Sequence, residues 1–235
     1  MRQIILDTET TGLKPEEGHR IIEIGAIEIV YRMFTHNDFH QYINPGREVE
    51  FEALKVHGIT NEFLADKPKF VDVANEFLRY IEGAELIIHN APFDVGFLDY
   101  ELRILDKSFP GVASDCSIVD TLTMARKMYP GKKNSLDALC KRHGVDNSNR
   151  DYHGALLDAR LLADVYLLMT GGQMQLFGDS TFASENEPRN TAVQQIEHTN
   201  LLISEVSAEE LELHKKQLVR INELSDGKCL WLGDD

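Results

Sequence analysis

Residues 4–9, IILDTE, and residues 21–31, IIEIGAIEIVY, carry the strongest indication of the fold of this chain. The first stretch is a short continuous apolar run that ends in two acids, and the second is rich in β-branched residues with partial alternation. Both patterns are typical of β-strands that bury at least one face. We therefore expect two strands near the start of the chain, antiparallel to each other.

Outward from these strands, the chain up to Gly172 alternates strand-like and helix-like segments. Short strand-like runs occur at 39–43, 86–89 and 118–119, and helical periodicity occurs at 70–81, 121–128, 135–142 and 155–169. Asn90-Ala91-Pro92 has the composition of a helix start, because proline is tolerated in a first turn. Antiparallel strands followed by βα units predict an α/β fold with a mixed sheet flanked by helices.

The character of the chain changes after Gly172. Residues 178–200 are polar and lack an apolar period, as in a flexible linker. Ser207-Ala208-Glu209-Glu210 then predicts a capping box and a helix ending near Gly227. Its apolar stripe, too small to form a core alone, consists of Leu211, His214, Leu218 and Ile221. We therefore expect a domain over 1–172, a peptide and linker over 173–206, and a docking segment over 207–235.

Composition sets limits on the class of protein. The chain has 235 residues, a hydrophobic fraction of 43% and no apolar run of the ~20 residues that a membrane span needs. Its three cysteines are far apart and form no CxxC pair, which disfavours a disulfide framework or a zinc site and fits a reducing compartment. These features predict a cytoplasmic protein with no membrane partner.

The formal net charge of −15 counts against a nucleic-acid partner, because phosphate affinity normally comes from lysine and arginine. The cations are unevenly placed, however, and six of them occur between Arg126 and Arg142 against the single acid Asp137. A solvated surface and a DNA-facing patch both explain this segment. Charge alone does not decide between them.

Asp7 and Glu9 follow the apolar run at 4–6 and are two residues apart. Residues two apart on a strand point to the same face, so these carboxylates should lie together. Two neighbouring anions repel unless a cation bridges them, and oxygen ligands suit Mg²⁺ or Mn²⁺. The alternative is a strand end with two ordinary solvated acids.

Two further acids head apolar helix stripes. Asp94 precedes Leu98, Leu102 and Leu105 on one face, and Asp158 precedes Leu162, Val165 and Met169. Each acid is either a cap stabilised by the helix dipole or a ligand at the edge of the sheet. Five residues span about 140° of a helix, so His153 should lie in the loop before the helix that carries Asp158. His153 could equally be a loop histidine without a role.

Together, four carboxylates and one histidine are the inventory of two-metal phosphodiester hydrolysis. DTETTG at 7–12, HNAPFD at 89–94 and HGALLD at 153–158 resemble the three motifs of the DEDDh 3′→5′ exonuclease superfamily. Within it, KVHGIT at 55–60, MYPGKKNSLDALC at 128–140 and the terminal GKCLW at 227–231 resemble the epsilon proofreading-subunit family of bacterial DNA polymerase III. The resemblance is close up to Gly172 and looser beyond.

The resemblance implies a ribonuclease-H-like fold with a five-stranded mixed sheet and the acids at its carboxyl edge. It implies two divalent cations, Mg²⁺ or Mn²⁺, the first held by Asp7, Glu9 and Asp158 and the second by Asp7 and Asp94. It makes His153 the general base, since histidine titrates near neutrality. The residues that it implies for binding the terminal nucleotide at a DNA 3′ end are Asp7, Glu9, Thr10, Leu13, Val56, His57, Phe93 and Asp158.

A short peptide follows the expected domain. Gln173, Leu176 and Phe177 resemble the Gln-x-x-Leu-Phe peptide that bacterial proteins insert into the sliding clamp. A helix tail that folds back on the core is the alternative. The resemblance also implies the polymerase (alpha) subunit of DNA polymerase III as a partner, with a small accessory subunit as a further candidate.

Three functions follow from these observations. The leading one is a proofreading exonuclease that releases 5′-mononucleotides from single-stranded or frayed DNA. An exoribonuclease of the same superfamily would use the same acids. A non-catalytic adaptor between polymerase and clamp is the third, and the five intact catalytic positions count against it.

Overall fold

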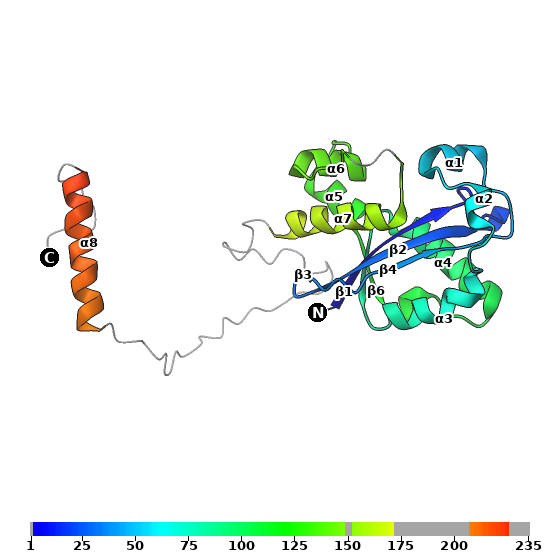
Figure 1. Ribbon diagram of the computed structural model, residues 1–235, viewed down its shortest axis with the longest axis horizontal. Helices are drawn as coiled ribbons and strands as arrows, with labels where there is room; N and C mark the ends of the chain where they lie inside the picture. Colours follow the sequence, from blue (N-terminus) through cyan, green and yellow to red (C-terminus); the bar gives the residue numbers. More distant parts are fainter. Residues whose placement is uncertain (1, 149–151, 172–206, 226–235) are drawn as a thin grey trace, which may run out of the picture. The chain divides into compact units, whose positions relative to one another are not determined.

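The computed structural model describes residues 2–148, 152–171 and 207–225 (Figure 1). The chain divides into two compact units, Met1–Ser180 and Thr181–Asp235. The first unit contains β1 (Arg2–Thr10), the 3-10 helix η1 (Pro15–Glu17), β2 (Ile21–Val30), β3 (Met33–Phe34), β4 (Phe39–Tyr42), α1 (Phe51–His57), α2 (Asn61–Leu64), α3 (Phe70–Ile81), β5 (Glu85–Ile88), α4 (Ala91–Leu105), the 3-10 helix η2 (Val112–Ser114), β6 (Ser117–Asp120), α5 (Thr121–Met128), α6 (Leu136–His143) and α7 (Ala155–Thr170). The second contains α8 (Ala208–Leu224).

A mixed sheet forms the centre of the first unit. The strand order is β3-β2-β1-β5-β6, with β4 also paired to β2. β1 runs antiparallel to β2 and parallel to β5, and β5 runs parallel to β6. The carboxyl ends of β1, β5 and β6 therefore lie at one edge of the sheet.

The sheet has six strands where five were expected. β3 pairs with the end of β2 at Ile29 and Val30, and β4 pairs with its beginning at 23–26. Tyr31 and Arg32 have positive φ and turn the chain between β2 and β3, which is two residues long. After β3, β4 pairs with the same edge of β2. Two short strands thus share one position, and the sheet stays five positions wide.

Helices cover both faces of the sheet, as Figure 1 shows. On one face, alternate residues such as Ile4 and Leu6 pack with Phe77 of α3 and Phe97 of α4. On the other face, Ile5 packs with α6 and α7. Because alternate residues of a strand face opposite ways, β1 contributes side chains to the hydrophobic cores on both faces of the sheet. The expected α/β class is confirmed.

Most of the expected helices are confirmed, two of them, α3 and α5, with the bounds that the periodicity gives. The helices α1 and α2 were not expected, because seven and four residues are too short to set a helical period. Asn90 precedes α4 as expected, but its side chain does not cap the helix. Its backbone instead takes a left-handed φ of 68°, and its amide donates to Asp120 Oδ1 at 3.1 Å.

In the second unit, α8 begins with the expected capping box. Ser207 Oγ accepts from the Glu210 amide at 3.2 Å, and the Ser207 amide donates to Glu210 Oε2 at 2.9 Å. Among its described residues α8 buries none. The expected clamp peptide at 173–177 and the linker lie outside the described residues. None of the described helices is long and apolar enough to cross a membrane.

Candidate active site

The end of β1 divides its side chains between the two faces of the sheet. Thr8 and Thr10 are buried, whereas Asp7 and Glu9 alternate with them and are half-buried. A register shift against β2 occurs between Glu9 and Thr10, and such bulges re-aim side chains at the ends of strands. The expected shared face of Asp7 and Glu9 is confirmed.

The first turn of α7 lies directly against β2, beside these acids. Gly25 is the cross-strand partner of Asp7, and Glu23 is the partner of Glu9. A Cβ at Gly25 would lie 2.2 Å from the Leu156 nitrogen, so glycine allows this close approach. The buried Glu23 carboxylate accepts from the Ala155 amide at 3.1 Å and from His40 Nε2 at 2.7 Å. Helix and strand are thus fixed together where the acids meet.

His153 lies in the loop before α7, as the spacing predicts. Its amide donates to the Val56 carbonyl at 3.0 Å, which fastens the loop to α1. The neighbouring Tyr152 ring lies over Gly58, where a Cβ would approach it to 3.0 Å. The His153 side chain is 43% exposed, and its Nδ1 lies 3.2 Å from Asp158 Oδ2. The loop therefore holds an accessible imidazole against a buried carboxylate.

Three of the expected site residues form a group that could hold a metal ion. One ligand atom from each of Glu9, His153 and Asp158 lies within 4.8 Å of the others. Asp158 is 3% exposed and lies in the first turn of α7, where the helix dipole stabilises a negative charge. Two carboxylates at this spacing, with Asp7 on the same face, fit a hard divalent cation. The donor set is therefore compatible with the expected metal chemistry.

Asp94 reaches the same edge of the sheet from the other face. It lies in the first turn of α4, is 3% exposed, and its Oδ1 accepts from Thr8 Oγ1 at 2.6 Å. Burial raises the pKa of Asp94, and the hydrogen bond from Thr8 partly opposes this rise. The group of ligand atoms within 4.8 Å does not include Asp94 or Asp7.

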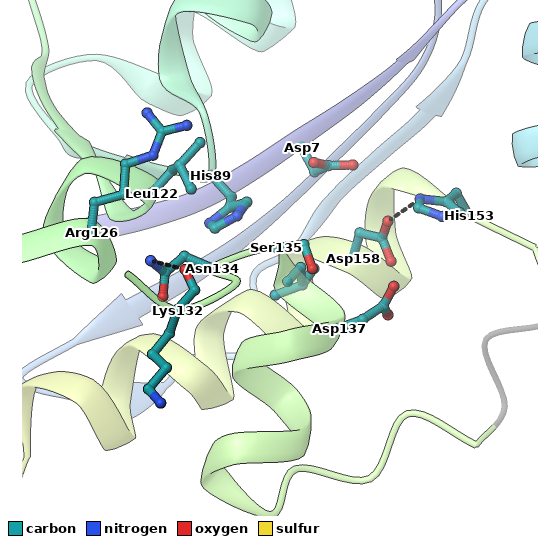
Figure 2. A pocket seen from close by; sticks show the side chains of 11 residues that line it. Asp7, His89, Leu122, Arg126, Lys132, Asn134, Ser135, Asp137, His153 and Asp158 are labelled. Carbon is teal, nitrogen blue, oxygen red and sulfur yellow. Dashed lines mark hydrogen bonds and ion pairs between the residues drawn. The ribbon is translucent and has the colours of Figure 1, made fainter. Parts of the chain in front are cut away.

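A pocket of about 540 Å³ opens beside these acids. Figure 2 shows Asp7, Asp158 and His153 on one side of it and Arg126 and Lys132 on the other. The remaining side chains that line it are His89, Leu122, Asn134, Ser135, Leu136 and Asp137. Its volume lies within the range usual for small-ligand sites.

The residues expected to bind the terminal nucleotide differ in their accessibility. Leu13 and Val56 are exposed, 79% and 47%, and offer apolar surface to a base. Phe93 is half-buried, and its ring centroid lies 5.0 Å from that of Phe97. Thr10 and His57 are buried, and the Thr10 hydroxyl donates to the Gly12 carbonyl at 2.6 Å. Thr10 ends β1, Val56 and His57 end α1, and Phe93 lies in the first turn of α4.

Glu23 and Gly25 shape the site and were missed in the sequence. Both interrupt the apolar strand IIEIGAIEIV, and a buried acid within such a strand is a signal that could have marked Glu23. Thr8 was missed for another reason: its bond to Asp94 joins two motifs whose distance no sequence pattern gives. His89, the first residue of the HNAPFD motif, lines the pocket as well, although the motif alone assigns it no role.

Comparisons with known proteins agree with this geometry. Residues 4–166 match the exonuclease family RNase_T. DNA polymerase III subunit epsilon of Pasteurella multocida is 53% identical, covering 98% of this chain and 93% of that protein. The subunit of the same name from Escherichia coli K12 is 50% identical, covering 98% and 97%.

Solved structures share the fold. An exonuclease X in complex with 5′ overhanging duplex DNA is 28% identical with a TM-score of 0.53, covering 74% of this chain and 95% of that chain. An Escherichia coli exonuclease I complex with single-stranded DNA has a TM-score of 0.64 at 21% identity, covering 75% and 42%, and supports the fold alone. The chain thus belongs to the RNase_T exonuclease family and, within it, to the family of DNA polymerase III epsilon subunits.

Proposed function

We propose that this chain is a 3′→5′ exonuclease that removes single nucleotides from single-stranded or frayed DNA, as the proofreading subunit of a DNA polymerase III. The observation that carries the proposal is the convergence of Glu9, Asp158 and His153 at the sheet edge beside Asp7. The family matches support the same activity.

The residues of the chain would divide the work as follows. Asp7, Glu9 and Asp158 would hold one divalent cation, and Asp7 with Asp94 would hold a second, Mg²⁺ or Mn²⁺ in each case. When bound, such cations supply Lewis acidity that favours ionised water and stabilises a departing 3′ oxygen. His153 accepts the proton of the attacking water at its imidazole, while Leu13 and Val56 hold the terminal base.

Hydrolysis of a labelled single strand with a 3′-OH tests the catalytic proposal. The full chain should release 5′-mononucleotides from the 3′ end, and excess chelator should stop it. A mismatched 3′ terminus should be cut faster than a paired one, because a paired terminus must first unpair, at a cost of a few kcal/mol. Equal or faster trimming of RNA would favour the exoribonuclease function, and activity in chelator would refute the metal assignment.

Docking to other replication proteins is a separate part of the proposal. Residues 207–235 would bind the polymerase (alpha) subunit, because α8 exposes apolar side chains such as Leu211 and Ile221 within its own unit. Gln173, Leu176 and Phe177 would bind the sliding clamp.

Binding measurements on the full chain test these contacts. Changing Leu176 and Phe177 together to alanine should weaken the clamp contact and leave the polymerase contact unchanged. Met174→Ala is the matched control, because Met174 lies between the anchoring positions. Unchanged clamp binding in the double variant would refute the peptide assignment.

A further inference from the structure

The pocket beside the acids has a basic wall, formed by Arg126 of α5 and Lys132 of the loop that follows it. Figure 2 shows both on the side away from Asp158 and His153. We propose that this basic wall binds the phosphates of the retained strand, on the 5′ side of the bond that is cut. The inference rests on the proposed function and says where the polymer is held beyond its last nucleotide.

The loop that carries Lys132 is firmly braced. Asn134 is 8% exposed, and its Nδ2 donates to the Lys132 carbonyl at 3.1 Å. Arg142 donates to the Lys133 carbonyl at 2.8 Å and to Asn134 Oδ1 at 3.3 Å. The Arg142 guanidinium also lies 4.3 Å from the Tyr129 ring centroid. This bracing fixes the backbone beneath Lys132 before any strand arrives.

The structure separates the roles of the cations between Arg126 and Arg142. Arg142 braces the loop, whereas Arg126 and Lys132 line the pocket. Lys127 and Lys133 belong to the same segment and are exposed, but they are not among the described residues that line the pocket. Among the cations between Arg126 and Arg142, all of which the structure describes, two line the pocket beside the acids.

The chemistry of the substrate explains why cations belong on the wall of the pocket away from Asp158 and His153. A strand carries one phosphate per nucleotide, so phosphates continue past the cut bond and need positive charge outside the acid cluster. Arg126 and Lys132 are exposed, and contacts of exposed charges are weak and sensitive to salt. Such contacts hold a strand without fixing its register. The strand can then advance after each nucleotide leaves.

Two substrates separate this basic wall from the catalytic group. A short single-stranded oligothymidylate carries upstream phosphates, whereas the p-nitrophenyl ester of thymidine 5′-monophosphate has none. In the full chain, Arg126→Ala and Lys132→Ala should each raise KM for the oligonucleotide about fivefold with little change in kcat. The KM for the small ester should rise much less. Each variant should also flatten the salt dependence of oligonucleotide binding by about 0.7 in log–log slope.

Lys127→Ala is the matched control, because it removes an exposed cation that shares α5 with Arg126 but does not line the pocket. Fluorescence anisotropy of a labelled oligothymidylate in chelator gives the affinity without any hydrolysis. Equal KM increases for both substrates, an unchanged oligonucleotide affinity, or the same effect from Lys127→Ala would each overturn the inference. A wild-type chain that binds the oligonucleotide through these cations but hydrolyses neither substrate would refute the proposed function alone.

Discussion

Replacing Gly25 with alanine adds one methyl group at the point where α7 meets the sheet. The added Cβ would lie 2.2 Å from the Leu156 nitrogen, 2.3 Å from the Ala155 carbonyl carbon and 2.4 Å from the Leu156 Cα. All three are backbone atoms, so no side-chain rotation relieves the clash. Because Asp7 is the cross-strand partner of Gly25, the change is also adjacent to the acids.

The size of the clash sets the size of the effect. Non-bonded atoms of this kind rest at about 3.5–4 Å, so the first turn of α7 must move by more than about 1 Å. Overpacking of this kind typically costs about 1–3 kcal/mol of unfolding free energy. A displacement of about 1 Å in a catalytic group can lower turnover about 10²-fold. Asp158 lies in the same first turn, so we expect the larger loss to be in turnover.

The assay combines turnover on a single strand with urea denaturation of the same variant. The expected destabilisation is a fraction of the about 5–15 kcal/mol of a typical domain, so Gly25→Ala should remain folded at 25 °C. Gly96→Ala in α4 is the matched control, since nothing lies within 4 Å of its added Cβ. It should keep its turnover and gain up to about 1 kcal/mol of stability. Wild-type turnover in Gly25→Ala would show that the close approach of α7 to Gly25 does not position the catalytic groups.

Three other changes test the remaining parts of the site. His153→Ala should lower kcat about 10²–10⁴-fold and regain part of it at raised pH, as hydroxide replaces the base; an unchanged pH profile would remove His153 from this role. Asp94→Asn should stabilise the chelated protein against urea at pH 8, because the raised pKa of Asp94 makes its ionised form costly. The asparagine oxygen can still accept from Thr8, and the gain should shrink as the pH falls towards the ordinary Asp value of 3.8; a constant gain would contradict this origin. Glu23→Ala leaves the buried Ala155 amide without its acceptor and should cost about 1–3 kcal/mol in urea denaturation, whereas Glu23→Gln should cost less because it keeps an acceptor; equal losses would make the carboxylate charge, rather than the bond, the cause.

Periodicity predicts the elements of this fold where one face of an element meets the core. The segment 70–81 is a helix as expected, because Phe70, Phe77 and Ile81 fall on one buried stripe. The segment 51–57 is also a helix, yet its Phe51 and Val56 are exposed, so no apolar stripe marks it. Burial thus leaves a pattern in the sequence, and a short surface helix does not.

Sequence patterns also predict which face of a strand or helix carries each active-site residue, but they do not predict the distances between residues on different elements. Alternation places Asp7 and Glu9 on one face, and the spacing of His153 from Asp158 places the histidine in a loop. The bond from Thr8 to Asp94 and the approach of α7 over Gly25 depend on how elements far apart in the chain pack. Such contacts follow from three-dimensional packing, on which local patterns carry no information.

The two faces of the sheet explain how acids from distant parts of the chain reach the same edge of the sheet. α4 and α7 pack on opposite faces, and each places a 3%-exposed aspartate in its first turn, Asp94 on one side and Asp158 on the other. A helix dipole partly stabilises each of these carboxylates, and each has a side-chain partner: Thr8 donates a hydrogen bond to Asp94, and His153 Nδ1 lies 3.2 Å from Asp158 Oδ2. β1 supplies Asp7 on the face that α7 covers, opposite Gly25. Buried charge on its own disfavours folding, and under the proposed function bound cations would offset that cost, so we predict that the chelated protein is the less stable form. Thermal denaturation with and without Mn²⁺ measures that difference, and an equal Tm in both conditions would contradict the argument.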